Sequence, residues 1–168
     1  MKKSVLLGAI VALGVVFSGC ESTKVTNVQI DQKIKYPTVN VKCKDKGDMR
    51  VFNRELEKAI NAEVATQGLQ RGEDLLIRCG FIEYDEGNRG LRMLAAVGLV
   101  MGKGTASAQI VLVDKTGQQV GEFTALSSVS AGVTGGDTDF EEKMAKEIVA
   151  TVKSKFYNGK LTPKASEK

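Results

Sequence analysis

The first 20 residues constrain this chain most, because they determine which part of it takes part in folding. Two lysines precede an apolar run over residues 5–17, and a pair of small residues then leads to Cys20. A positive start, a short hydrophobic stretch and a small-residue cleavage site are typical of a secretory signal. The run has 13 residues, whereas a transmembrane helix needs about 20. We therefore expect residues 1–19 to be a signal peptide that lies outside the mature fold.

The residues around the cleavage point resemble the lipobox of bacterial lipoproteins, in which a cysteine sulfur receives a diacylglycerol. Ser18, Gly19 and Cys20 match this motif, so we expect cleavage before Cys20 and lipidation of that residue. An ordinary membrane anchor or a signal without lipidation is the alternative. Acyl chains hold a protein on a bilayer because each buried methylene contributes about 0.8 kcal/mol. Glu21 stands where an aspartate commonly favours the inner membrane, so the resemblance implies an outer-membrane lipoprotein facing the periplasm.

The composition of the mature chain excludes several classes of function. Cleavage leaves 149 of 168 residues, with 22 basic and 20 acidic side chains, which suits one domain and a tether. No cluster of basic and aromatic residues indicates nucleic-acid binding. The chain has no histidine, so a Ser-His-Asp or Cys-His catalytic set cannot form within it. We expect a protein that is not an enzyme and carries no cofactor.

Periodicity predicts the first half of the domain. Residues 38–43 and 75–84 read as strands with apolar odd positions. Between them, 49–67 has an apolar face that repeats every fourth residue, typical of an amphipathic helix. Asp48 is placed to cap this helix at its start, and Gly68 is placed to end it. A strand, a helix and a strand in this order predict a crossover with a parallel pair.

The second half of the domain reads as a hairpin and a helix. Residues 105–113 and 118–129 are predicted strands joined by a turn. A second amphipathic helix is predicted to begin at residue 138 or 139, with an apolar residue at every fourth position from Phe140 to Phe156. Together these elements predict an α/β (α+β) domain with one small mixed sheet of about four strands and two amphipathic helices on one face. The predicted parts are the tether 20–36, with at most a short strand near its end, the periplasmic domain 37–159 and a disordered tail 160–168.

Two cysteines remain after the lipidation site. Cys43 and Cys79 lie on the apolar faces of the two predicted neighbouring strands, and the periplasm is oxidising. A disulfide between them is one interpretation. Two buried, inert thiols are the other, because cysteine often serves as a small core residue. Two cysteines without histidine do not make a zinc site, so no metal is expected.

The order of these elements resembles a bacterial lipoprotein family classed only as a domain of unknown function. The resemblance covers most of residues 38–157. It lies in the strand 75–84, the polar turn 85–89, the Gly/Ala-rich stretch 90–104, the turn 113–117 and the loop 135–137 before the last helix. That family has no assigned activity, so it implies no residue roles. More distantly, the topology is similar to envelope lipoproteins of the curli-secretion type, which concerns the fold alone.

One segment is a candidate partner surface. Residues 91–104 are rich in glycine, alanine, methionine and leucine, and an exposed apolar patch of this kind binds a protein partner, a second copy or a lipid surface. The candidate contact residues are Leu91, Met93, Leu94, Leu99 and Met101. The alternative is that the segment packs into the domain as an extra strand or short helix, with its glycines allowing close approach.

Two polar loops are a weaker candidate site for a small ligand or cation. Asp85 and Glu86 lie in one loop, and Asp137 and Asp139 lie before the last helix. These carboxylates can ligate calcium if the loops meet, although the spacing does not match an EF-hand. Ordinary helix capping is the alternative for Asp137 and Asp139.

The function predicted from these observations is that of a membrane-anchored envelope lipoprotein. We expect a non-catalytic structural or interaction protein in envelope assembly or maintenance, held on the membrane by its N-terminal lipid. Its expected partner is another envelope protein or further copies of itself, and not nucleic acid. The alternative function is a periplasmic binding module for a small ligand or cation.

Overall fold

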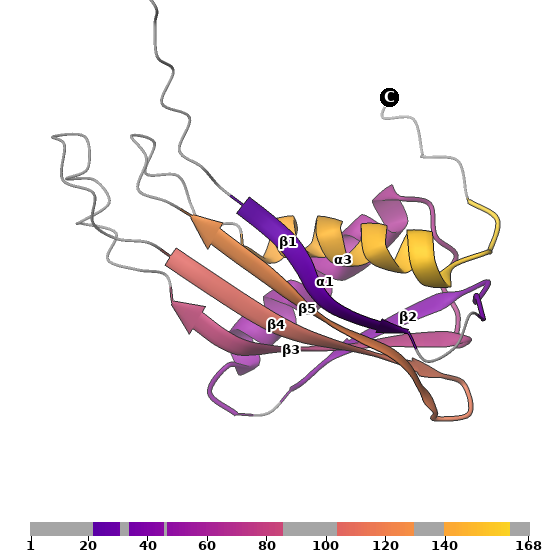
Figure 1. Cartoon of the computed structure of the whole chain (residues 1–168), viewed down its shortest axis with the longest axis horizontal. Helices are drawn as coiled ribbons and strands as arrows, with labels where there is room; N and C mark the ends of the chain where they lie inside the picture. The colour runs from indigo at the N-terminus through magenta and orange to yellow at the C-terminus, as the bar shows by residue number, and fades with distance from the viewer. Residues whose placement is uncertain (1–21, 31–33, 46, 86–103, 130–139, 162–168) are drawn as a thin grey trace, which may run out of the picture.

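A mixed five-stranded sheet carries two helices on one face (Figure 1). The structure is a computed structural model that describes residues 22–30, 34–45, 47–85, 104–129 and 140–161. The strand order is β1-β5-β4-β3-β2. The predicted α/β class, mixed sheet and pair of helices are confirmed, with five strands in place of about four. The elements are β1 (Ser22–Ile30), β2 (Val39–Cys43), α1 (Arg50–Thr66), β3 (Leu75–Asp85), β4 (Gly104–Asp114), β5 (Gln119–Val129) and α3 (Phe140–Phe156).

Strand β1 corrects the prediction that residues 20–36 are a tether. Nine of those residues form an antiparallel edge strand paired with β5. A bulge between Thr26 and Gln29 interrupts the pairing, and Asn27 there has a φ of 54°. A bulge adds one residue to one strand and shifts the alternation of faces. The segment therefore lacks the strict two-residue period by which a strand is recognised in a sequence.

The β2-α1-β3 crossover agrees with the prediction. Strands β2 and β3 are parallel neighbours, and α1 packs over them. Gly68 ends the helix with a φ of 71°, and the N–H of Leu69 donates to the carbonyl of Val64 at 3.0 Å. Leu69 is itself buried, as expected for the hydrophobic contact of this type of helix end.

The predicted cap at the start of α1 is wrong. Met49 occupies the N-cap position in place of Asp48, no side chain caps the helix, and its first turn contains no acidic residue. The turn before it, with Gly47 at a φ of 87°, brings the chain into the helix one residue later than the sequence indicated.

The core lies between the sheet and the helices. Helix α3 packs against β1 and β5, and α1 packs against α3 as well as β2 and β3. The apolar residues predicted at every fourth position of α3 are all fully buried. They are Phe140, Met144, Ile148, Val152 and Phe156.

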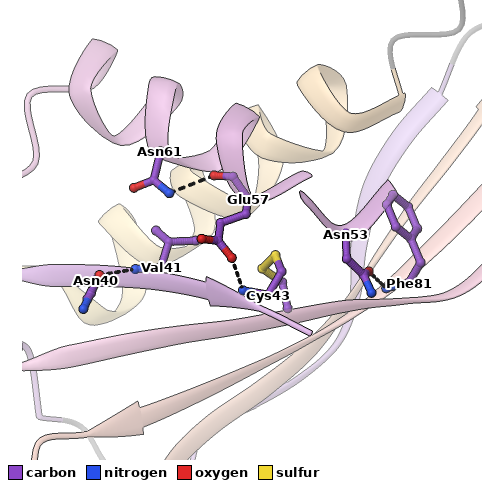
Figure 2. Close-up of a disulfide and its surroundings, with 8 residues drawn as sticks. Asn40, Val41, Cys43, Asn53, Glu57, Asn61 and Phe81 are labelled. Carbon is purple, nitrogen blue, oxygen red and sulfur yellow. Dashed lines mark hydrogen bonds between the residues drawn. A yellow bond between two sulfur atoms is a disulfide. The ribbon is translucent and has the colours of Figure 1, made fainter. Parts of the chain in front are cut away.

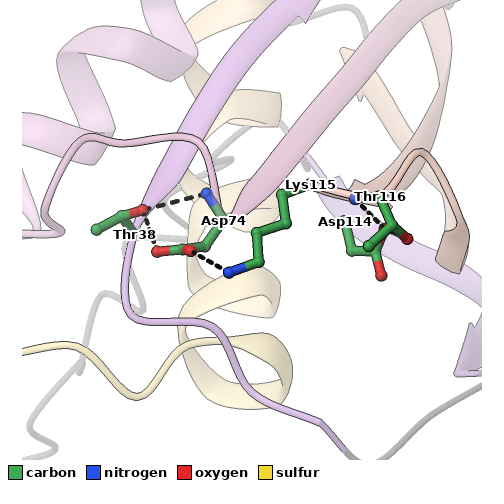
Figure 3. A network of polar contacts seen from close by, with 5 residues as sticks. All are labelled: Thr38, Asp74, Asp114, Lys115 and Thr116. Atoms are coloured by element: carbon green, nitrogen blue, oxygen red, sulfur yellow. Dashed lines mark hydrogen bonds and ion pairs between the residues drawn. The ribbon is translucent and has the colours of Figure 1, made fainter.

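The β4-β5 turn is organised around one carboxylate (Figure 3). Asp114 accepts hydrogen bonds from the N–H of Thr116 at 2.8 Å, from its hydroxyl at 2.6 Å and from the N–H of Gln118 at 3.0 Å. Gly117 supplies a φ of 88°, which only glycine adopts without strain. Beside the turn, Lys115 lies 3.8 Å from Asp74, whose other oxygen accepts the Thr38 hydroxyl at 2.7 Å.

These hydrogen bonds predict how the turn responds to pH. The Thr116 hydroxyl is the largest cause that lowers the pKa of Asp114 below 3.8, and neighbouring backbone N–H groups add to it. Because the folded pKa is lowered, the stabilisation is present above the ordinary pKa and is lost as the pH falls through the folded value. We expect Thr116→Val to raise the pKa of Asp114 toward its ordinary value, as measured by carboxyl NMR titration. Thr124→Val on β5 is the control, and an unchanged pKa in Thr116→Val would contradict this account.

Candidate functional site

The N-terminal end of β1 lies at one end of the sheet together with the ends of three other strands (Figure 1). Ser22 pairs with Ser128, Thr105 pairs with Ser128, and Asp85 pairs with Thr105. Side-chain oxygens of Ser22 and Ser128 lie 3.0 Å apart. Since Ser22 follows the predicted lipidation site by two residues, we call this row of four residues the anchor end.

The predicted partner surface lies outside the described residues, but its flanks border the anchor end. Leu91, Met93, Leu94, Leu99 and Met101 are in the undescribed range 86–103. That range is bounded by Asp85 and Gly104, and Gly104 pairs with Val129 next to Ser128. Both ends of the segment therefore lie at the same end of the sheet as the start of β1, separated from that strand by β5.

The predicted ligand loops are only partly described. Asp85 ends β3 at the anchor end, whereas Glu86, Asp137 and Asp139 lie outside the described residues. Within the ranges that the structure covers, no group of three or more potential metal-binding side chains occurs. The calcium interpretation and the capping interpretation both stay predictions.

A disulfide joins Cys43 and Cys79 (Figure 2). The two residues are register partners on β2 and β3, with Cα atoms 4.3 Å apart, and both side chains are buried. Of the two interpretations that the sequence left open, the structure has the bridge. It holds the C-terminal end of the edge strand β2 on the interior strand β3.

Two polar residues of α1 that were not predicted bind the sheet near this disulfide (Figure 2). Asn53 is only 2% exposed and accepts the N–H of Phe81 at 2.8 Å, beside the bulge between Phe81 and Glu83. Glu57 accepts the N–H of Cys43 at 2.7 Å. Each directly follows an apolar residue of the helix, Phe52 or Leu56. A polar side chain beside the apolar face is the sequence signal that would have indicated a contact with the sheet.

The N–H groups on the outer edge of β2 are bonded within the chain. Val39 donates to the carbonyl of Gln70 at 2.9 Å, and Val41 donates to the side chain of Asn40 at 2.9 Å. With the Cys43–Glu57 bond, these contacts occupy donors that would otherwise be open to another strand. Bonding of these three donors within the chain disfavours the addition of another strand at the β2 edge.

A groove of about 670 Å³ runs between α1 and α3. Apolar positions such as Phe52 and Ala59 line it together with both acidic and basic side chains, and Glu55 pairs with Lys58 at 2.7 Å. Phe52 stacks on Tyr84 with ring centroids 4.0 Å apart. The charges around the groove are mixed in sign, so its lining favours no single ligand class.

No helix in the described part of the chain is both long enough and apolar enough to cross a membrane.

The fold is similar to that of solved structures with very different sequences. A PelC dodecamer from Paraburkholderia phytofirmans matches with a TM-score of 0.52 and 9% identity, covering 83% of this chain and 100% of that chain. A single-substitution variant of the same PelC dodecamer has a TM-score of 0.49 and 10% identity, with the same coverage. At these identities the likeness concerns the fold alone. Among curated proteins, none matches the chain.

A family model covers residues 24–133, which is more than half of the chain. It spans β2 through β5 and all but the first two residues of β1. The predicted resemblance to a family without assigned activity is confirmed, while the distant similarity to curli-secretion-type proteins stays a prediction. The chain belongs to the family described as domain of unknown function DUF4410.

Proposed function

We propose that this protein is a lipid-anchored envelope protein with a non-catalytic role in assembling or maintaining an envelope complex. In this proposal Cys20 carries the lipid, the outer membrane holds it, and the domain faces the periplasm. The observation that carries the proposal is the anchor end. There the strand that leads to Cys20 begins at the same end of the sheet as both flanks of the apolar segment 91–104, Asp85 on β3 and Gly104 on β4.

This placement supports a contact surface close to the membrane. Only Glu21 separates Cys20 from β1, so a lipid on Cys20 holds the anchor end next to the bilayer. A partner that is also held on the membrane is concentrated in the plane of the bilayer. Two anchored proteins therefore bind each other more tightly than the same two proteins free in solution.

A ring or smaller assembly of identical copies is the partner that we propose. PelC, whose fold is similar, is a dodecamer. Closed symmetric assemblies are the commonest form of soluble oligomers. Copies anchored by the same residue also present the same surface at the same height above a membrane, which favours contact between them.

Crosslinking in native cells, followed by mass spectrometry, tests the proposal. We expect self-crosslinks or a recurrent envelope partner through residues 90–104. Met93→Asp combined with Met101→Asp is expected to remove those crosslinks without changing the thermal unfolding temperature, because charge disfavours a buried apolar contact. Cys20→Ser is expected to move the protein out of the membrane fraction.

The control is Ile34→Asp, a position that is 55% exposed and follows Ile30, the end of β1 opposite to the anchor end. It is expected to leave the crosslinks intact. If the methionine variants unfold the domain, residues 91–104 belong to the core and the proposed surface is wrong. A monomer without captured partners contradicts the assembly role itself.

A further inference from the structure

A cationic hollow lies on the sheet beside the disulfide. It has a volume of about 390 Å³ at the β2 edge, away from the α1–α3 groove. A second hollow of about 450 Å³ shares Lys42, Cys43 and Lys44 with it and continues to the start of α1. The first is lined by Lys42, Cys43, Lys44, Arg78, Cys79, Gly80, Gln109 and Val111.

The described residues that line the first hollow include three cations and no carboxylate. Lys42, Lys44 and Arg78 are all exposed. Within the described residues none of the three takes part in an ion pair. The aliphatic part of the Lys44 side chain lies against the backbone of Gly80. A Cβ atom added to Gly80 would be 2.8 Å from the Cδ atom of this lysine. The absence of a side chain at this position lets the lysine lie across the sheet.

The arrangement of these cations disfavours folding. Lys42 and Arg78 are direct register partners on β2 and β3. Like charges placed directly opposite each other destabilise a sheet. The other neighbour of Arg78 is Val111 on β4, which does not offset the repulsion. The nearest carboxylate along this row of the sheet, Glu122 on β5, is the register partner of Val111 and bonds Gln109, and it makes no described ion pair with the three cations. Cations that no described ion pair neutralises suit a ligand that supplies negative charge.

The second hollow extends this positive surface. Arg50 and Arg54 line it, together with the carboxylates of Asp45 and Glu57. Glu57 is bonded to the N–H of Cys43, and Asp45 lies 4.0 Å from Arg54. We call Lys42, Lys44, Arg50, Arg54 and Arg78 the cationic edge. With five cations and two acids, its balance is positive.

We propose that the cationic edge binds an acidic polysaccharide, a chain of sugars that carry carboxylates. Exposed ion pairs are individually weak, so several cations spread over two adjoining hollows suit a polymer with repeated charges better than a single ion. A protein partner would call for an apolar centre, and among the described residues Val111 is the only aliphatic side chain lining either hollow. The lining therefore favours a hydrated, charged ligand.

The position of the cationic edge favours a polymer in the periplasm over the bilayer that holds the protein. This step rests on the proposed anchoring through Cys20. On β3, Arg78 precedes Asp85 of the anchor end by seven residues, and a rise of about 3.3 Å per residue puts roughly 23 Å between them. The cationic edge thus lies away from the end of the sheet that the lipid holds next to the bilayer.

NMR titration of the mature protein in nonionic detergent micelles tests the inference, with polygalacturonate as the probe and dextran as the neutral control. We expect saturable chemical-shift changes at the amides of Lys42 and Arg78 with polygalacturonate and none with dextran. These changes are expected to disappear in about 0.5 M NaCl, because salt screens exposed charges. Lys42→Glu is expected to weaken binding about tenfold. Its thermal stability is expected to stay the same or rise, because it creates an opposite-charge pair with Arg78.

Lys146→Glu on α3 is the matched control, since it changes the net charge equally at an exposed site outside both hollows. Equal weakening by the two variants, or no saturable binding by the unaltered protein, would overturn the inference. So would shifts at the same amides with micelles doped with phosphatidylglycerol but not with polygalacturonate, because the surface would then bind a membrane. Failure of the crosslinking test leaves this result unaffected, so the two proposals fail separately.

Discussion

Replacing both Cys43 and Cys79 by alanine is expected to lower the free energy of unfolding by about 3–4 kcal/mol. The residues are 36 apart in sequence, and a bridge across a loop of about 37 residues removes that much chain entropy from the unfolded state. Both side chains are buried among apolar residues, so alanine leaves no polar group unsatisfied. The bridge also fastens the end of β2, which has β3 as its only neighbour in the sheet.

Urea unfolding with and without dithiothreitol measures this effect. The unaltered protein is expected to lose stability on reduction and to approach the double alanine variant, which itself should not respond to the reductant. Equal stability of the oxidised protein and the double variant would show that the bridge contributes nothing, and that two inert thiols would serve the fold equally well.

Phe156→Ala is expected to lower the free energy of unfolding by about 3–5 kcal/mol. The ring is 0% exposed at the end of α3. It lies against the backbone of β5, since a Cβ on Gly121 would come within 2.7 Å of its Cζ atom. Because Gly121 has no side chain, nothing on that strand can move in to fill the space. The carbonyl of Phe156 also accepts the N–H of Tyr36 at 2.7 Å, which fixes the helix end in place.

Denaturant unfolding of a short series checks this prediction. Phe156→Leu retains much of the side-chain volume and is expected to cost less than Phe156→Ala. Val51→Ala removes an exposed apolar side chain and is expected to change stability by under about 0.5 kcal/mol. A small loss in Phe156→Ala would mean that the helix end is loosely packed against β5.

The elements that sequence reasoning predicted well depend on short-range patterns. Helices α1 and α3 repeat apolar residues every fourth position, and the structure buries Leu56, Ile60 and Val64 of one and all five predicted positions of the other. The β4-β5 hairpin follows from two alternating segments around a turn with Gly117. Each signal lies within about 20 residues, so local spacing is sufficient to reveal it.

Strand β1 escaped the same reasoning for a physical reason. Its bulge between Thr26 and Gln29 breaks the two-residue period. As an edge strand it is also largely polar and exposed, with Lys24 and Gln29 outward. Its stability comes from pairing with β5 about 100 residues away, which no local pattern reveals.

The candidate sites divide in the same way. The lipidation motif at Cys20 and the apolar segment 91–104 are continuous in sequence and were visible there. Asn53 and Glu57 lie beside the apolar stripe of α1 and belong to no recognisable motif, and their roles depend on β3 and β2 lying beneath the helix. The sequence contained the five members of the cationic edge, but they occur in three separate stretches.

By itself the sequence determined the class of fold, the two amphipathic helices, the crossover and the predicted lipid anchor. Only the tertiary structure decided that Cys43 is bonded to Cys79, that Lys42 stands opposite Arg78 and that the anchor end gathers Ser22, Thr105 and Asp85. Each of these depends on strand order and register. A shift of one residue in register moves a side chain to the other face of the sheet, so these juxtapositions arise only when the whole core has packed.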